Sequence, residues 1–154
     1  MGRTRIWLAL LGGGLLLLAA VPCTLLARDE LTITELKAKV PNANIPDRPG
    51  LCIHISEKQL EAANKLYQAG ESEQAKAALT DVTAFAELAR DYSIQSHKHE
   101  KQAEIALRKM SRKLADLKHT VLHEEQQPVQ DTIDRLEKVR DDLLLAMFPK
   151  GGKK

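Results

Sequence analysis

The sequence predicts an all-α protein, either an antiparallel helical bundle or a set of long-helix hairpins. Between residues 71 and 127 the chain contains neither glycine nor proline and is rich in Ala, Leu, Glu, Lys and Gln, which are good helix formers. Apolar residues there recur at alternating spacings of three and four, as on one helix face. This register comprises Leu79, Val82, Ala86, Ala89, Ser93, Ser96, Glu100, Ala103, Leu107, Met110, Leu114, Leu117 and Val121.

The amino-terminal segment, residues 1–27, has the pattern of a membrane-targeting leader. Arg3 and Arg5 precede an uncharged, mostly apolar run over residues 6–27, which is typical of a secretory signal peptide. The run also reaches the roughly 20 residues that a spanning helix needs, so a retained signal anchor stays open, as does a lipoprotein processed at Cys23. We therefore expect a periplasmic or secreted protein, or one anchored in the inner membrane through residues 6–27.

The charge balance beyond residue 27 argues against a nucleic-acid partner. This part carries 21 Lys and Arg, the 23 of the whole chain less Arg3 and Arg5, against 21 Asp and Glu, so its formal net charge is zero. Nucleic-acid binding usually needs a basic excess and, for single strands, aromatic stacking platforms. This part has few aromatic residues, namely Tyr67, Phe85, Tyr92 and Phe148.

Residues 28–50 are predicted to form a Pro-rich linker. It contains one short amphipathic piece, residues 34–40, and then three prolines and a glycine within residues 41–50, which oppose a regular helix. In residues 51–55 apolar side chains alternate with period two, which predicts a short strand-like segment. That segment either pairs with residues 31–34, which alternate in the same way, or lies extended on the helices.

A helical domain, residues 51–148, is expected to follow, and its first helix is predicted to begin at Ser56. Ser56 and Gln59 have the spacing of a capping box. Ile55 and Leu60 occupy the two positions of a hydrophobic staple. Gly70 supplies the left-handed residue that commonly ends a helix.

The long stretch that follows can be interpreted in two ways. Its register is unbroken, which favours one continuous helix of about 75 Å at 1.5 Å per residue. Residues 93–101, however, place Ser93, Ser96 and Glu100 where a core would need aliphatic side chains. A bend would occur there if the bundle folds back on itself; otherwise the polar positions are exposed or mark a gap filled by another subunit. The oligomeric state stays open for the same reason, and a homo-oligomer is possible.

The last helix is predicted to start at Pro128, whose missing N–H is not needed in a first turn, and to end near Phe148. The preceding connection is short, so this helix should fold back antiparallel on residues 103–122. A basic excess before the connection and an acidic excess after it favour this docking. Residues 149–154 are expected to be a flexible basic tail. The residues predicted to be buried on the last helix are Val129, Ile133, Leu136, Leu143 and Met147.

Two segments resemble known helical families. Residues 63–82 resemble a single tetratricopeptide-type helical hairpin, but Gln59 and Glu87 stand where that family has an aromatic residue and a proline, and no second copy follows at the period of about 34 residues. Residues 55–59 are similar to the Leu-Thr-x-x-Gln motif of small periplasmic helical stress adaptors and chaperones. The residues at tetratricopeptide spacing are Ala63, Leu66, Tyr67, Gly70, Ala75, Leu79 and Val82.

Asp116, His119 and His123 are the candidate metal ligands. At positions i, i+3 and i+7 of one helix they would share a face and offer a carboxylate and two imidazoles to Zn²⁺ or Cu²⁺. The apolar register places them on the opposite, solvated face, where histidines near a helix end also interact favourably with its dipole without a metal. His97 and His99 diverge on a helix and form a site only if the chain bends there.

Cys52 is the only cysteine after residue 27. We expect it to be buried beside Ile53, and a reactive thiol or a bridge to another chain are the alternatives. His54 could point the same way from a strand, but no third metal ligand is evident.

The sequence contains no motif for catalysis and no motif for a bound cofactor. A glycine-rich phosphate loop and a nucleophile elbow are both missing. We therefore expect an exported, non-enzymatic protein-binding or scaffolding module whose protein partner is not identified. A periplasmic metal-binding or envelope-stress sensor with chaperone-like character, and a membrane-tethered spacer, are the alternatives.

Overall fold

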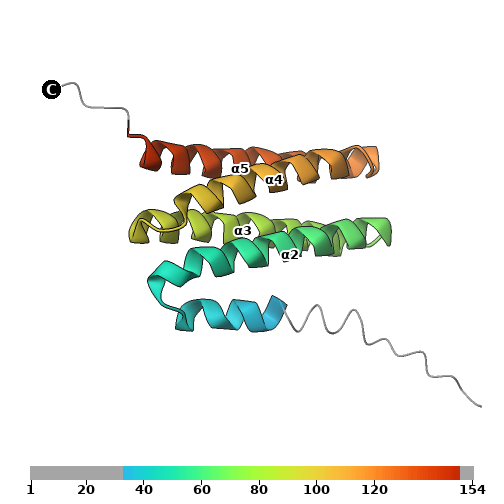
Figure 1. Ribbon diagram of the computed structural model, residues 1–154. Coiled ribbons are helices and arrows are strands. Elements are labelled where there is room, and N and C mark those ends of the chain that lie inside the picture. Colours follow the sequence, from blue (N-terminus) through green and yellow to red (C-terminus); the bar gives the residue numbers. More distant parts are fainter. Residues whose placement is uncertain (1–32, 150–154) are drawn as a thin grey trace, which may run out of the picture.

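The computed structural model describes residues 33–149, and in this range the predicted all-α fold class is confirmed. Two antiparallel hairpins, α2–α3 and α4–α5, lie on each other, and a short helix over residues 33–39 lies on the far side of the first hairpin (Figure 1). The predicted leader falls outside the described residues, as does nearly all of the predicted tail. The helices are α2 (Arg48–Gln68), α3 (Ser72–Ser96), α4 (Glu100–Lys118) and α5 (Gln126–Met147), and the 3₁₀ turns are η1 (Val40–Asn42), η2 (Ile45–Asp47) and η3 (His123–Glu125).

The core lies between the two hairpins. It is built from one apolar stripe of each long helix, and it includes Leu60, Val82, Leu107, Leu114 and Leu136. A smaller cluster of Val40, Cys52, Ile55 and Ala89 holds the amino-terminal turns against the first hairpin. Among the described residues, no helix is both long and apolar enough to cross a bilayer.

The strand predicted over residues 51–55 is wrong, because these residues belong to α2, which begins at Arg48. Pro49 lies in the first turn, where the backbone N–H has no helical partner in any case. The period of two was coincidental: Cys52, Ile55 and Gln59 are buried together along one helix face.

The capping box and the hydrophobic staple predicted around Ser56 are therefore also wrong. Ser56 is fully buried in the middle of α2, and its hydroxyl donates a hydrogen bond to the carbonyl oxygen of Val82 in α3 at 2.8 Å. The polar residue at this position joins two helices instead of starting one.

The described part of the predicted linker is not extended. Residues 33–39 are helical, and η1 and η2 follow before α2. Val40 is buried, and the ammonium group of Lys37 lies 2.6 Å from the carboxylate of Asp81 in α3. The prolines therefore stand in 3₁₀ turns and a first helical turn, which tolerate a missing N–H donor.

The turn after α2 agrees with the sequence prediction. Gly70 has φ of 77°, and Glu71 N–H donates to the carbonyl oxygen of Leu66 at 2.9 Å while Gly70 N–H donates to that of Tyr67 at 3.1 Å. These are the two hydrogen bonds of a Schellman motif. Residues 63–82 thus form a tight helical hairpin, and its relation to the tetratricopeptide family stays a prediction.

The long glycine- and proline-free stretch is broken where its polar residues predicted a bend. α3 ends at Ser96, α4 begins at Glu100, and His97 and His99 between them have φ of 52° and 62°. Of the two alternatives that the sequence left open, the structure has the bend.

α5 packs antiparallel on α4, as predicted, and begins two residues before Pro128. Pro128 is then the third residue of the helix, still among the positions whose N–H groups have no helical acceptor. Of the residues predicted to be buried, Met147 is only half-buried. The others, Val129, Ile133, Leu136 and Leu143, are buried.

Candidate functional site

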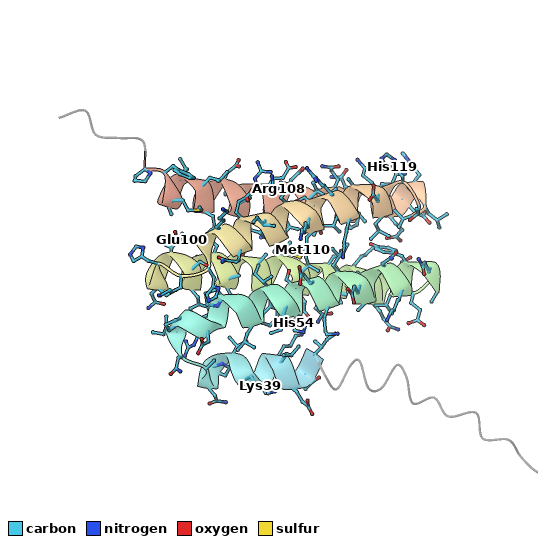
Figure 2. The ribbon with its side chains drawn as sticks, viewed as in Figure 1. Lys39, His54, Glu100, Arg108, Met110 and His119 are labelled. Carbon is cyan, nitrogen blue, oxygen red and sulfur yellow. The ribbon has the colours of Figure 1, made fainter. Side chains whose placement is uncertain are left out.

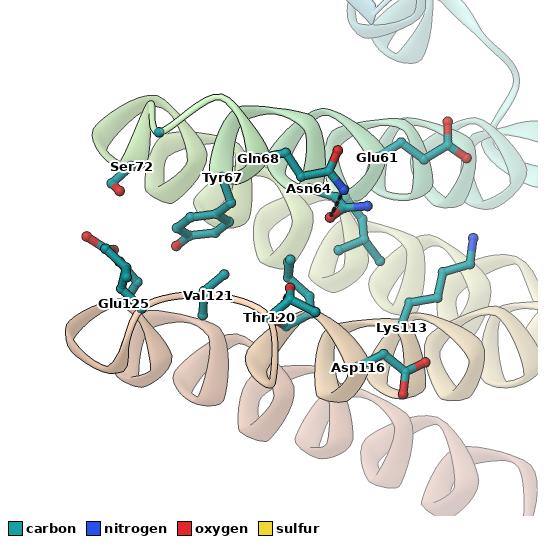
Figure 3. Close-up of a pocket in the computed structure, with 14 residues that line it drawn as sticks. Glu61, Asn64, Tyr67, Gln68, Ser72, Lys113, Asp116, Thr120, Val121 and Glu125 are labelled. Carbon is teal, nitrogen blue, oxygen red and sulfur yellow. Dashed lines mark hydrogen bonds between the residues drawn. The ribbon is translucent and has the colours of Figure 1, made fainter.

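A cleft of about 790 Å³ opens between the carboxyl-terminal halves of α2 and α4 (Figure 3). These two helices run in the same direction, and the α4–α5 connection closes the cleft at its end. α3 packs along α5 much more extensively than α2 packs along α4. The side of the bundle between α2 and α4 is therefore its open side.

The floor of the cleft is apolar and its rim is polar. Leu60 and Leu117 reach it from the core, Val121 is half-buried, and the side chain of Leu122 is 68 % exposed at the mouth. An isoleucine- or leucine-sized group from another molecule would be desolvated on these surfaces. The polar lining residues are Glu61, Asn64, Gln68, Ser72, Lys113, Asp116, Thr120 and Glu125.

Tyr67 is the most unusual group in this cleft. Its hydroxyl oxygen is buried, and within the described residues it has no hydrogen-bond partner. Figure 3 shows its ring pointing from α2 toward the α4–α5 connection, with Glu125 on the facing side. Burial, and then the carboxylate of Glu125, raise the pKa of the Tyr67 phenol. At neutral pH the phenol is therefore a protonated hydrogen-bond donor, and residues 33–149 supply no acceptor for it.

Glu125 is nearly buried, at 7 % exposure, and forms an ion pair across the end of the bundle. The ammonium nitrogen of Lys76 in α3 lies 3.2 Å from Glu125 Oε2 and 3.0 Å from Glu73 Oε1. The carboxylates of Glu73 and then Glu125 raise the pKa of Lys76. This ion pair holds the α4–α5 connection against α3.

The predicted metal ligands do not share a helix face. The prediction assumed that the helix continues through His123, but α4 ends at Lys118. Asp116 lines the cleft, His119 lies at the outer end of α4 (Figure 2), and His123 is exposed in η3. Throughout residues 33–149, no three His, Cys, Asp or Glu side chains are close enough together to hold a metal ion.

The two other histidine groups do not converge either. His97 and His99 lie in the exposed α3–α4 connection, where His97 Nδ1 is 3.7 Å from Glu100 Oε1. His54 is exposed, whereas Cys52 is fully buried two residues earlier on α2. The strand on which their side chains would have pointed the same way does not form.

The prediction that Cys52 is buried is confirmed. Burial raises the pKa of its thiol to about 11, and nearby Arg48 lowers it by less. The thiolate is the nucleophilic form of cysteine. Near neutral pH this thiol is therefore protonated, and it packs as a small apolar group with Val40, Ile55 and Ala89.

Sequence reasoning missed Tyr67 and Glu125 as members of one site. In the sequence Tyr67 stands out only as one of few aromatic residues and by its spacing in the hairpin resemblance, and no sequence pattern singles out Glu125. The one available signal was that Tyr67 is one of few aromatic residues beyond the leader. Glu125 is 58 positions away from Tyr67 in sequence. The two residues come close only when the α4–α5 hairpin packs on the α2–α3 hairpin.

Comparisons with known proteins give no family assignment. No protein-family model matches the chain, and no curated protein and no solved structure is significantly similar to it. The geometry of the cleft is therefore the basis for a functional proposal.

Proposed function

We propose that this is an exported, non-enzymatic binding module that holds a protein partner in the cleft between α2 and α4. The observation that carries the proposal is the cleft itself, with an apolar floor, a polar rim and a Tyr67 hydroxyl that has no hydrogen-bond partner among residues 33–149. Clefts with these properties are typical of binding sites. Export is inferred from the leader pattern of residues 1–27.

The charge of the lining residues favours a basic partner. Glu61, Asp116 and Glu125 contribute carboxylates, against the single ammonium group of Lys113, and the Glu125 charge is balanced by Lys76. Glu61 and Asp116 are exposed at the rim, where opposite charges on a partner raise the rate and the specificity of association. The partner that fits is a peptide segment with an apolar side chain next to Lys or Arg.

The Tyr67 hydroxyl adds a requirement for an acceptor. A peptide that enters the cleft brings backbone carbonyl groups, each of which accepts a hydrogen bond. A carbonyl oxygen bound to Tyr67 would satisfy a buried donor that has no partner in the described part of the chain. A buried donor without a partner costs free energy in the unbound protein. This donor would orient the peptide on the apolar floor.

The proposal is tested by selecting peptides on the immobilised protein from a random phage-displayed library. We expect the enriched sequences to combine a large apolar residue with adjacent Lys or Arg. Fluorescence anisotropy then gives the Kd of a labelled peptide for the wild type and for Asn64→Trp, which fills the cleft from its exposed rim. The Trp variant should bind at least about tenfold more weakly, a loss of about 1.4 kcal/mol or more.

Gln95→Trp is the matched control, because Gln95 is an exposed amide on α3 at the other end of the bundle. It should bind like the wild type. Selection without a common pattern, or equal affinities for the two Trp variants, would contradict the proposal. The mass of the mature protein tests export separately, since removal of residues 1–27 is expected for a cleaved leader.

A further inference from the structure

The connection between α3 and α4 is strained. It consists of His97, Lys98 and His99, and both histidines adopt left-handed backbone conformations, with φ of 52° and 62°. Residues with a Cβ atom rarely adopt this conformation, because the Cβ atom approaches the carbonyl oxygen. All three side chains are exposed. The strain is therefore imposed by the packing of the two hairpins that this connection joins.

The other tight turn of the bundle is built differently. The turn from α2 to α3 uses Gly70 for its left-handed residue and closes with two Schellman hydrogen bonds, so it incurs no Cβ strain. The three residues between α3 and α4 include neither glycine nor proline. Each of them can continue a helix.

The buried faces of α3 and α4 also belong to one helical register. If residues 97–99 became helical, the two helices would join into one helix from Ser72 to Lys118, about 70 Å long at 1.5 Å per residue. The spacing of three and four is uninterrupted across the join, so both buried faces would lie on the same side. The buried members of this register are Leu79, Val82, Ala86, Ala89, Ser93, Ala103, Leu107, Met110, Leu114 and Leu117.

We propose that this connection is a hinge through which two copies of the chain exchange hairpins. In the exchanged dimer α3 and α4 form one helix, and the α2–α3 hairpin of each copy packs on the α4–α5 hairpin of the other. Short strained hinges favour such exchange, and the hairpins repack through the interface that the single-chain bundle already has. The bonds between hairpins are remade between copies, including the ion pair of Arg90 Nη1 with Asp142 Oδ2 at 2.8 Å and the contact of Ser56 Oγ with Met110 Sδ at 3.5 Å.

The polar residues around the hinge suit the exchanged form. A two-fold axis at the hinge brings residues 93–100 of both copies past each other in opposite directions. Ser96 of one copy then lies level with Glu100 of the other, and the hydroxyl can donate a hydrogen bond to the carboxylate there.

Sedimentation velocity of the full chain in a non-ionic detergent, over a hundredfold range of concentration, tests the exchange. We expect a monomer–dimer equilibrium that responds to the hinge sequence. His97→Ala with His99→Ala disfavours the left-handed turn and should raise the association constant at least about tenfold. His97→Gly with His99→Gly relieves the strain in the monomer, so this variant should have an association constant lower than that of the wild type by a similar factor.

The controls are His119→Ala with His123→Ala and the corresponding glycine pair, which alter two histidines in the α4–α5 connection. His119 has an ordinary φ of −75°, so these variants should associate like the wild type. Equal association constants for all hinge variants would overturn the proposal.

A cross-link shows whether the dimer has exchanged its hairpins. Both native cysteines are first removed by Cys23→Ala and Cys52→Ala. Chains that then carry Arg90→Cys are mixed at high concentration with chains that carry Asp142→Cys, and a short bismaleimide is added. Exchange places the introduced thiol at position 90 of one chain beside the introduced thiol at position 142 of the other, so a covalent heterodimer is expected. A dimer that associates through the leader would not give this covalent heterodimer. If the covalent heterodimer is absent from the dimer fraction, hairpin exchange is refuted.

Discussion

The two hairpins of this bundle are held together by different kinds of side chain. The first hairpin buries mainly small residues, and the second buries mainly large aliphatic ones. α2 and α3 are also in more extensive contact than α4 and α5. The small buried residues of the first hairpin are Cys52, Ser56, Ala63, Ala75, Ala78, Thr83, Ala86, Ala89 and Ser93, and the large ones of the second are Leu107, Met110, Leu114, Leu117, Val129, Ile133, Leu136, Val139 and Leu143.

Polar bonds show the same difference. Ser56 bonds to the Val82 carbonyl inside the first hairpin, and Gln59 Nε2 lies 2.7 Å from Asp81 Oδ2 beside it. The second hairpin has a comparable bond only at its edge within the described residues, where Lys118 Nζ lies 2.7 Å from Gln130 Oε1. Small side chains let helices approach closely enough for polar groups to bond across, whereas leucines separate them. The comparison leads to three predictions about stability.

Shortening a large residue should have the greatest effect in the second hairpin. Leu136→Ala removes a fully buried side chain from α5 and leaves a cavity, so we expect the free energy of unfolding to fall by about 3 kcal/mol. Urea denaturation followed by circular dichroism measures the change. Leu145→Ala is the control on the same helix, because Leu145 is 54 % exposed and should cost less than about 0.5 kcal/mol. A similar loss in both variants would contradict the aliphatic packing described for α5.

Enlarging a small residue should have the next largest effect, in the first hairpin. Ala86 is fully buried on α3, and Ala86→Leu should lower the free energy of unfolding by about 2 kcal/mol through overpacking. Thermal denaturation compares it with Ala84→Leu, two residues earlier and exposed, which should leave Tm almost unchanged. If Ala86→Leu stabilises the protein instead, α2 and α3 have room between them for a larger side chain. The first hairpin would then not be more closely packed than the second.

Removing a buried hydroxyl should have the smallest effect, and the effect should depend on its partner. Ser56→Ala removes the bond to the Val82 carbonyl and should cost about 1 kcal/mol. Ser93→Ala removes a buried hydroxyl without a partner among the described residues, so it should be neutral or slightly stabilising. Urea denaturation of the two variants provides the comparison, and an equal cost in both would mean that the Ser56 bond does not contribute.

The same difference explains which elements could be predicted from sequence. Large aliphatic residues at spacings of three and four correctly predicted that α4 and α5 are helical and which faces they bury, including Leu114 and Leu136, but they did not predict that α4 ends at Lys118. The start of α2 was misread because its buried face consists of Cys52, Ile55, Ser56 and Gln59, a mixture that carries little hydrophobic periodicity. Pro49 and Gly50 also argued locally against a helix whose stability comes from packing on α3.

The candidate site could be predicted only in part. The spacing of Asp116 to His119 and His123 predicted that it is a metal ligand. That spacing places the three side chains on one face only if the helix continues through His123. The cleft that contains Asp116 depends on how two hairpins lean against each other. No sequence pattern within one hairpin predicts how the two hairpins pack, and Tyr67 and Glu125 belong to different hairpins.

By itself, the sequence determined that the body of this protein is helical, that Gly70 ends a helix and that the last helix folds back on its predecessor. These features follow from local propensity, turn chemistry and the period of the apolar residues, which act over a few neighbouring positions. The tertiary structure decided that the chain bends at His97 and His99, that the turns before α2 pack on α3, and that a cleft opens between α2 and α4. Those outcomes depend on the burial of surfaces distant in sequence, and that burial outweighs the local preference of residues 97–99 to remain helical.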